Sequence, residues 1–148
     1  MRYSVIGIDP GTKSPAKCRL LVSDGRLYWD GLQQLADRAV VVVEMPYPRP
    51  KSSRQSLITL GFSAGVLSGV ASEGGRAVIK YATPQGWRAV YGEENRKVDK
   101  TILHNRVWRD YADQLPARPA SHDECDAMLI ALAYVLKPEA FTLWQNKI

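Results

Sequence analysis

The sequence is poor in cysteine and has no long hydrophobic run. Cys18 and Cys125 lie far apart and form no Cys-X-X-Cys pair, which argues against a disulfide scaffold and against a zinc site. No apolar run approaches the roughly 20 apolar residues that a membrane-spanning helix needs, and the run at residues 39–43 stops at Glu44. The first residues run directly into a strand-like segment, so we expect no signal peptide, no membrane segment and a cytoplasmic protein.

Internal repeats and low-complexity segments are also lacking. The 148 residues are 45% hydrophobic and 24% charged, which is typical of one folded domain, here residues 1–148, rather than of a disordered chain. There are 20 Lys and Arg residues against 15 Asp and Glu residues, and the net charge of +5 is compatible with a polyanionic partner without establishing one. The basic residues gather in residues 46–56 and 80–106, a pattern that an ordinary solvated surface explains as well.

Short apolar segments alternate with turn signals and amphipathic segments. Residues 3–9 predict a buried strand, and the β-branched residues 39–45 predict a central strand covered on both faces. Asp24-Gly25 predicts a hairpin turn between strands at 17–23 and 26–29. The remaining predicted elements are a strand at 76–81 and helices at 31–38, 55–72, 96–114 (Val98, Ile102, Val107 and Tyr111 inward) and 121–136. This order is typical of an α/β or α+β protein.

Four carboxylates stand at positions that bear on function. Asp9 ends a predicted strand before Pro10-Gly11, and Glu44 interrupts the run of valines at the end of the predicted central strand. Asp123 and Asp126 lie three residues apart on the last predicted helix and therefore share one of its faces. A lone carboxylate buried at position 44 would cost several kcal/mol unless it were paired or bound to a cation.

Each acid has a simpler explanation when it is taken alone. Asp9 fits the role of a turn former, and Glu44 fits a place just outside the strand. Ser121 and Glu124 match a Ser-X-X-Glu capping box, and Asp123 suits the positive end of the helix dipole. However, the ends of two adjacent strands and the start of one helix can together bring the four carboxylates close to one another. Such a cluster favours two Mg²⁺ or Mn²⁺ ions and metal-dependent cleavage of a phosphodiester.

The ordered set of motifs resembles the RuvC-type Holliday junction resolvases of the RNase H-like superfamily, as a divergent or phage-like member. The resemblance rests on Gly7-Ile-Asp-Pro-Gly11, on a strand ending in Val43-Glu44, and on His122-Asp-Glu-Cys-Asp-Ala127 running into an apolar helix. It implies an α/β RNase H-like fold with a central mixed five-stranded sheet flanked by helices. It also implies that Asp9, Glu44, Asp123 and Asp126 are both the catalytic residues and the metal ligands.

The resemblance further implies residues that contact DNA. Some members have a histidine at the position of Asp123, so the neighbouring His122 is an alternative ligand or an ordinary solvated residue. Tyr47 has the spacing of an aromatic that stacks at the junction, although packing on its own turn explains it equally well. Phosphate contacts would come from basic residues after the last strand, with Lys100 competing with Lys97 for one position. The expected DNA-binding set is Tyr47, Arg49, Lys51, Arg54, Arg88, Lys97 and Lys100.

The function implied is resolution of four-way or branched DNA by paired symmetric hydrolysis that leaves 5′-phosphate ends, in the cytoplasm of a bacterium or of a phage-infected cell. Symmetric incision implies a homodimer. The glycines at 61, 65 and 69 are a candidate for helix packing across that dimer or inside one monomer. Residues 137–148 form a C-terminal extension in which Phe141 and Trp144 suggest a short docked helix.

Three other functions are alternatives to junction resolution. An RNase H-like nuclease could act on RNA, or on branched DNA with relaxed specificity. Gly7–Thr12 also matches the first phosphate loop of actin-like ATPases, but the chain has no room for their second domain, so we expect no nucleotide cofactor. A non-catalytic DNA-binding module would have no reason to keep Glu44 in an apolar strand.

Overall fold

The computed structural model of the chain describes residues 2–10, 16–29, 39–45 and 77–143. Its strands are β1 (Arg2–Asp9), β2 (Ala16–Ser23), β3 (Arg26–Trp29), β4 (Ala39–Glu44), β5 (Ala77–Ala82) and β6 (Thr142–Leu143). The α-helices are α2 (Pro84–Arg88), α3 (Lys100–Asp110) and α4 (His122–Leu136), and three 3₁₀ turns lie at Ala89–Tyr91, Glu93–Asn95 and Pro138–Ala140. No described helix is long and apolar enough to cross a membrane.

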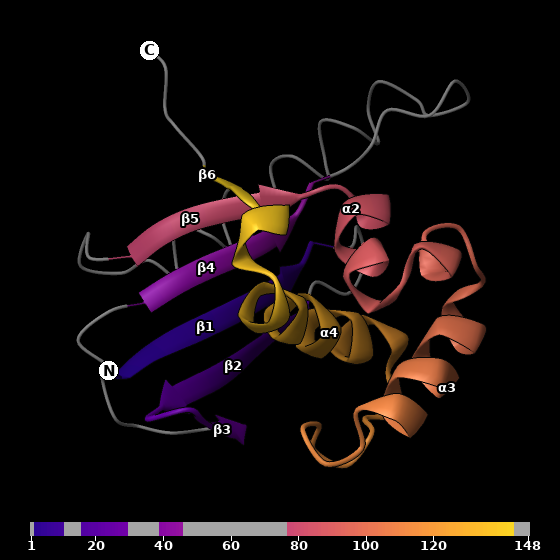
Figure 1. Ribbon diagram of the computed structural model, residues 1–148, viewed down its shortest axis with the longest axis horizontal. Helices are drawn as coiled ribbons and strands as arrows, with labels where there is room; N and C mark the ends of the chain where they lie inside the picture. The colour runs from indigo at the N-terminus through magenta and orange to yellow at the C-terminus, as the bar shows by residue number, and fades with distance from the viewer. Residues whose placement is uncertain (1, 11–15, 30–38, 46–76, 144–148) are drawn as a thin grey trace.

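The strands form one mixed sheet in the order β3-β2-β1-β4-β5-β6 (Figure 1). β1 pairs with β2 in antiparallel fashion and with β4 in parallel, and β4 pairs in parallel with β5. The mixed α/β architecture predicted from the sequence is therefore confirmed. The sixth strand was not predicted: β6 pairs antiparallel with β5, with Thr142 opposite Tyr81.

The short helix expected around Phe141 and Trp144 is wrong where the structure describes it. Pro138 starts a 3₁₀ turn instead, and Phe141 then adopts an extended backbone with φ −110° and ψ 140°. This conformation feeds β6 and buries the Phe141 ring at 5.6 Å from the ring of Tyr134. Trp144 lies outside the described residues.

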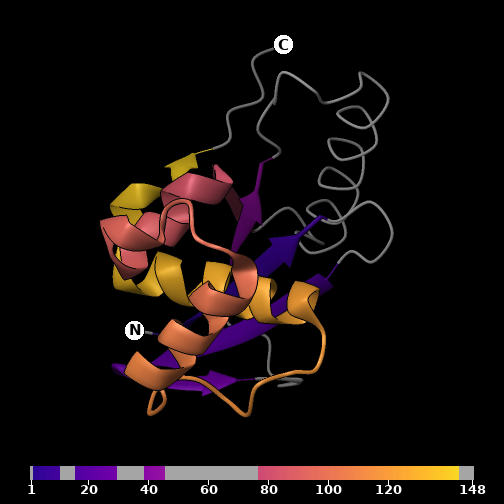
Figure 2. The same cartoon turned by 90° about the vertical axis from the view of Figure 1, so that its right-hand side faces the viewer.

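The two faces of the sheet have separate hydrophobic cores, because side chains alternate along each strand. Val5 and Val42 pack into the larger core with α4, whereas the smaller core on the opposite face consists of Ile6, Ile8, Val41 and Val43. Helix α4 packs against β1, β2 and β4 and lies across them in Figure 1. Figure 2 shows α2, α3 and α4 together on that side of the sheet.

Gly7 sets the distance between α4 and the sheet. A Cβ atom at this position would lie 2.1 Å from the Ala127 carbonyl oxygen and 3.0 Å from the Ala131 Cβ. The absence of a side chain at Gly7 therefore lets the helix rest directly on the backbone of β1. This contact fixes the start of α4 beside the ends of the central strands.

Helix α3 is shorter than predicted, and one residue assigned to its buried face is exposed. The helix begins at Lys100, because the Asp99 side chain caps it by accepting a hydrogen bond from the Thr101 backbone N–H at 2.9 Å. Ile102, expected to face inward, is 46% exposed, and the buried face consists of Leu103, His104 and Val107. The predicted helices at 31–38 and 55–72, and the glycines at 61, 65 and 69, lie outside the described residues.

Candidate active site

Asp9 and Glu44 end adjacent parallel strands on the side of the sheet that faces α4. In the β1–β4 ladder Ile8 is opposite Val43, and Asp9 and Glu44 are the next residues of their strands. Ile8 and Val43 belong to the smaller core on the opposite face. Alternation therefore directs both carboxylates toward α4.

The first turn of α4 supplies two further carboxylates at the same edge of the sheet. Ser121 caps the helix by accepting a hydrogen bond from the Glu124 N–H at 3.4 Å, as the predicted capping box requires. Asp126 is 1% exposed and Asp123 is half-buried one turn before it. The contact of α4 with Gly7 holds this turn against β1.

The charges of these residues interact, with the largest effect on Asp9. Burial raises the pKa of Asp9 to about 7, and the negative charges of Glu44, Asp126 and Asp123 add to the increase, against an opposing effect of Lys100. Burial also raises the pKa of Glu44, and Asp126 contributes to that shift. Glu44, Asp126 and Asp123 are therefore close enough to Asp9 to disfavour its ionisation.

Asp126 differs from the other acids because both of its oxygens have polar partners. Oδ2 lies 2.9 Å from Nζ of Lys100, and Oδ1 lies 2.7 Å from Nε2 of the fully buried His104. Burial opposes ionisation of Asp126, but these two partners outweigh it and lower its pKa. The His104 ring also makes edge contacts with Trp108 at 6.2 Å and with His122 at 5.2 Å between ring centroids.

Glu44 is held by Trp87 and faces a nearby guanidinium. The indole N–H of Trp87 donates a hydrogen bond to Glu44 Oε2 at 2.6 Å. The positive charge of Arg88 acts to lower the pKa of Glu44, but the effect of burial is larger. Arg88 itself donates to the Val98 carbonyl at 3.3 Å, and its guanidinium carbon lies 5.7 Å from the centre of the Trp87 ring.

A divalent cation fits the charge and the donor chemistry of this site. Carboxylate oxygens are the ligands that Mg²⁺ and Mn²⁺ prefer, and burial together with the charges of three neighbouring acids raises the pKa of Asp9. Among the described residues, however, no group of three or more His, Cys, Asp or Glu side chains is arranged to hold a metal ion. The Lys100 ammonium instead provides positive charge next to Asp126.

The predicted DNA-contacting residues that the structure describes differ in their distance from the acids. Lys100 reaches the acids, whereas Lys97 is exposed and Arg88 is half-buried beside Glu44. His122 is exposed at the start of α4, with its ring against His104. The other predicted residues lie outside the described part of the chain, namely Tyr47, Arg49, Lys51 and Arg54.

Trp87 and His104 belong to the site, although the sequence did not single them out. The only signal for Trp87 was its place next to Arg88 in the segment Pro-Gln-Gly-Trp-Arg. His104 stands three residues before Val107, on the buried face of α3, where a polar residue requires a partner. Both residues contact carboxylates that are distant in the sequence.

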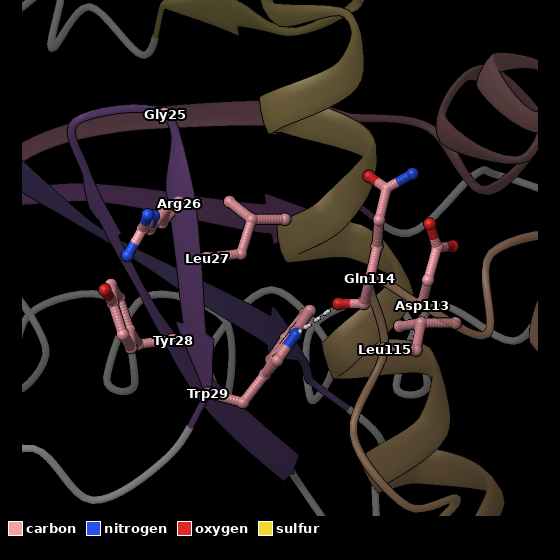
Figure 3. Close-up of a pocket in the computed structure, with 8 residues that line it drawn as sticks. All are labelled: Gly25, Arg26, Leu27, Tyr28, Trp29, Asp113, Gln114 and Leu115. Carbon is pink, nitrogen blue, oxygen red and sulfur yellow. Dashed lines mark hydrogen bonds between the residues drawn. The ribbon is translucent and has the colours of Figure 1, made fainter.

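A pocket between β3 and the turn after α3 contains none of the four acids (Figure 3). Its lining includes Trp29, whose indole N–H donates to the Gln114 carbonyl at 2.6 Å. β3 lies two strands away from β1 in the sheet. The acids at the ends of β1 and β4 therefore remain the candidate site.

The strand order and the mixed strand directions define an RNase H-like α/β fold. Two solved structures of RuvC from Thermus thermophilus share it: one in complex with a Holliday junction substrate, with a TM-score of 0.62, and one of RuvC alone, with a TM-score of 0.56. Each is 14% identical in sequence, and the match covers 95% of this chain and 99% of the RuvC chain. No family model matches the sequence, and no curated protein matches it significantly. The resemblance to RuvC-type resolvases is thus confirmed at the level of the fold.

Proposed function

We propose that this chain is a metal-dependent endonuclease that cleaves four-way or otherwise branched DNA. The observation that supports this most directly is that the buried Asp9 has Glu44, Asp126 and Asp123 near it, so that their negative charges add to the effect of burial and raise its pKa to about 7. Maintaining several buried like charges is costly in a purely structural role. Anion repulsion of this kind is relieved when a divalent cation binds.

The four acids would hold Mg²⁺ or Mn²⁺, with two ions per site as the proposed number. When bound, the ions supply electrostatic activation of the attacking water and stabilisation of the leaving oxygen. Asp126 would have to exchange its contact with Lys100 for a contact with the cation. The Lys100 ammonium would then be available to a phosphate oxygen of the substrate, and Arg88 would add positive charge on the Glu44 side.

Branched DNA is the proposed substrate for two reasons. One RuvC structure with this fold is a complex with a Holliday junction substrate, and the chain carries a net charge of +5. Paired cuts in a four-way junction require two active sites related by a two-fold axis, so the proposal includes a homodimer. Recognition would rest mainly on the shape and deformability of the junction.

Cleavage of end-labelled substrates tests this function. A synthetic four-way junction, a linear duplex of the same sequence and an RNA–DNA hybrid are incubated with wild type and with Glu44→Gln, with Mg²⁺, Mn²⁺ or EDTA. We expect wild type to cut the junction at symmetric positions with either metal, with products that ligate because they carry 5′-phosphates. EDTA and Glu44→Gln should abolish cutting.

Three other outcomes would contradict the proposal, when junction binding and ATP turnover are measured beside cleavage. Preferential cutting of the hybrid would identify an RNA-directed nuclease. Metal-independent binding of the junction without cutting would identify a non-catalytic DNA-binding module. ATP turnover without cutting would support an actin-like ATPase.

A further inference from the structure

Trp87 is placed beside Glu44 by strand β5, which precedes it, and by helix α2, which contains it. Glu44 is paired with Ala82 at the end of β5, and the chain turns into α2 directly afterwards. Thr83 caps α2 by accepting a hydrogen bond from the Gly86 N–H at 3.1 Å, and Pro84 occupies the first turn. The Trp87 side chain then lies fully buried with its N–H directed at Glu44 Oε2.

The choice of acceptor distinguishes Trp87 from the other two tryptophans that the structure describes, both of which are partly buried. Trp29 and Trp108 also donate their N–H groups, but to backbone carbonyls of Gln114 and Pro116, at 2.6 Å and 3.1 Å. Those bonds satisfy a partly buried donor in the usual way. Trp87 instead donates to a carboxylate at 2.6 Å, a charge-assisted bond of the stronger kind.

An indole restrains a carboxylate without neutralising it. Asp126 has a cationic partner in Lys100, whereas the Trp87 donor of Glu44 carries no charge. A tryptophan side chain has only two rotatable torsions, and Trp87 is fully buried. Its N–H therefore holds one oxygen of Glu44 at a fixed place. The Trp87 N–H therefore holds the Glu44 side chain in place without adding a positive charge beside it.

We propose that Trp87 is a positioning residue: it holds Oε2 of Glu44, so that Glu44 binds a divalent cation through Oε1. This inference rests on the proposed function, because it assigns a metal to the acid cluster. Partners that orient metal ligands typically change metal affinity by about 10- to 100-fold when they are removed. Trp87 would act only through Glu44 and would not itself contact metal or DNA.

The hydrogen bond can be tested without any metal. The chain has four tryptophans, and ¹⁵N labelling of the indoles identifies the Trp87 resonance as the one that Trp87→Phe removes. We expect Glu44→Gln to move this resonance and to leave those of Trp29 and Trp108 in place. A Trp87 resonance that does not respond to Glu44→Gln would overturn the inference.

Metal binding is measured with Mn²⁺ alone, by electron paramagnetic resonance of the unbound ion. We expect Trp87→Phe to weaken Mn²⁺ binding about tenfold and Trp29→Phe, the matched control, to change it less than twofold. In a Glu44→Gln background Trp87→Phe should have no further effect, because the two residues act as a unit. Equal losses in both backgrounds would overturn the inference.

A second variant separates loss of the hydrogen bond from any unfolding that Trp87→Phe causes. Site-specific replacement of Trp87 by benzothienylalanine exchanges the N–H for sulfur and keeps the bicyclic shape, so it should preserve the thermal midpoint and still weaken Mn²⁺ binding. Wild-type affinity in this variant, while wild type binds Mn²⁺ and cuts junctions, would overturn the role of Trp87 and leave the proposed function standing. Wild type that neither binds Mn²⁺ nor cuts would overturn both.

Discussion

The ammonium of Lys100 lies 2.9 Å from Oδ2 of Asp126, across the space between α3 and α4. The second Asp126 oxygen is bound by His104, so this carboxylate is ionised and fully partnered. Burial favours the uncharged form of Lys100, but the attraction of Asp126, Asp9 and Glu44 outweighs it and raises the pKa of the lysine. The Lys100 ammonium therefore lies among the acids of the candidate site.

Lys100→Met should reduce junction cleavage by about 100-fold, because a cation directed at developing charge typically contributes this much to the rate. Lys97→Met is the matched control, since Lys97 is exposed. Single-turnover cleavage rates at saturating Mg²⁺ make the comparison. Because the carboxylate of Asp126 is 1% exposed and would keep only His104 as a partner, the loss of Lys100 should also lower the free energy of unfolding, which urea unfolding measures. A larger rate loss in Lys97→Met would contradict the assignment.

Asp9→Asn should stabilise the metal-free protein, and increasingly so at higher pH. The folded pKa of Asp9 is about 7 against an ordinary value of 3.8, so the folded state binds the proton more tightly than the unfolded state. The contribution of this carboxyl to stability is then lost as pH rises from about 4 to about 7. Asparagine does not titrate, so its advantage should be small at pH 4 and reach at most about 4 kcal/mol at pH 8.

Urea unfolding in EDTA at pH 4, 6 and 8 measures this advantage. The control is Asp110→Asn, because Asp110 is exposed and its pKa is lowered by Arg109 rather than raised. A gain for Asp9→Asn that is the same at all three pH values would contradict the electrostatic explanation.

Mn²⁺ should reverse the order of stability between wild type and Asp9→Asn. A cation that binds only the folded state stabilises it by about 2.7 kcal/mol at a concentration 100 times its dissociation constant. Wild type should therefore gain several degrees in thermal midpoint on addition of Mn²⁺, and Asp9→Asn should gain little. Equal gains in the two proteins would indicate that Mn²⁺ binds elsewhere.

The places of the four acids in the fold could be predicted from the sequence because local patterns determine them, whereas their role as metal ligands and catalytic residues stays a prediction. The valine run that Glu44 ends marks a central strand, and Ser121 marks the start of α4. Alternation along the strands then predicts a common face for Asp9 and Glu44. Each of these patterns can be identified from a few neighbouring residues in the sequence.

The partners of the acids could not be predicted, because each contact joins distant segments through weakly patterned sequence. Trp87 lies on a helix of five residues that has no periodicity to read, and it meets Glu44 across 43 positions. His104 broke the hydrophobic pattern of α3, so Ile102 was assigned to the buried face in error. The choice between Lys97 and Lys100 was left open because loop lengths differ, and it stays a prediction; the Asp99 cap places Lys100 at the first position of α3.

Gly7→Ala should disable the site without changing any of its charged groups. The added methyl group would lie 2.1 Å from the backbone carbonyl of Ala127, so α4 and its Asp126 must move away from β1. Overpacking of this kind costs about 1–3 kcal/mol or more, and a displaced Asp126 should also lower the cleavage rate at least tenfold. The control is Gly25→Ala, where φ is +75° but nothing lies within 4 Å of the added atom, so it should cost about 1 kcal/mol and leave cleavage unchanged. Urea unfolding and junction cleavage of both variants make the comparison, and a Gly7→Ala protein as stable and as active as Gly25→Ala would show that α4 does not need this contact.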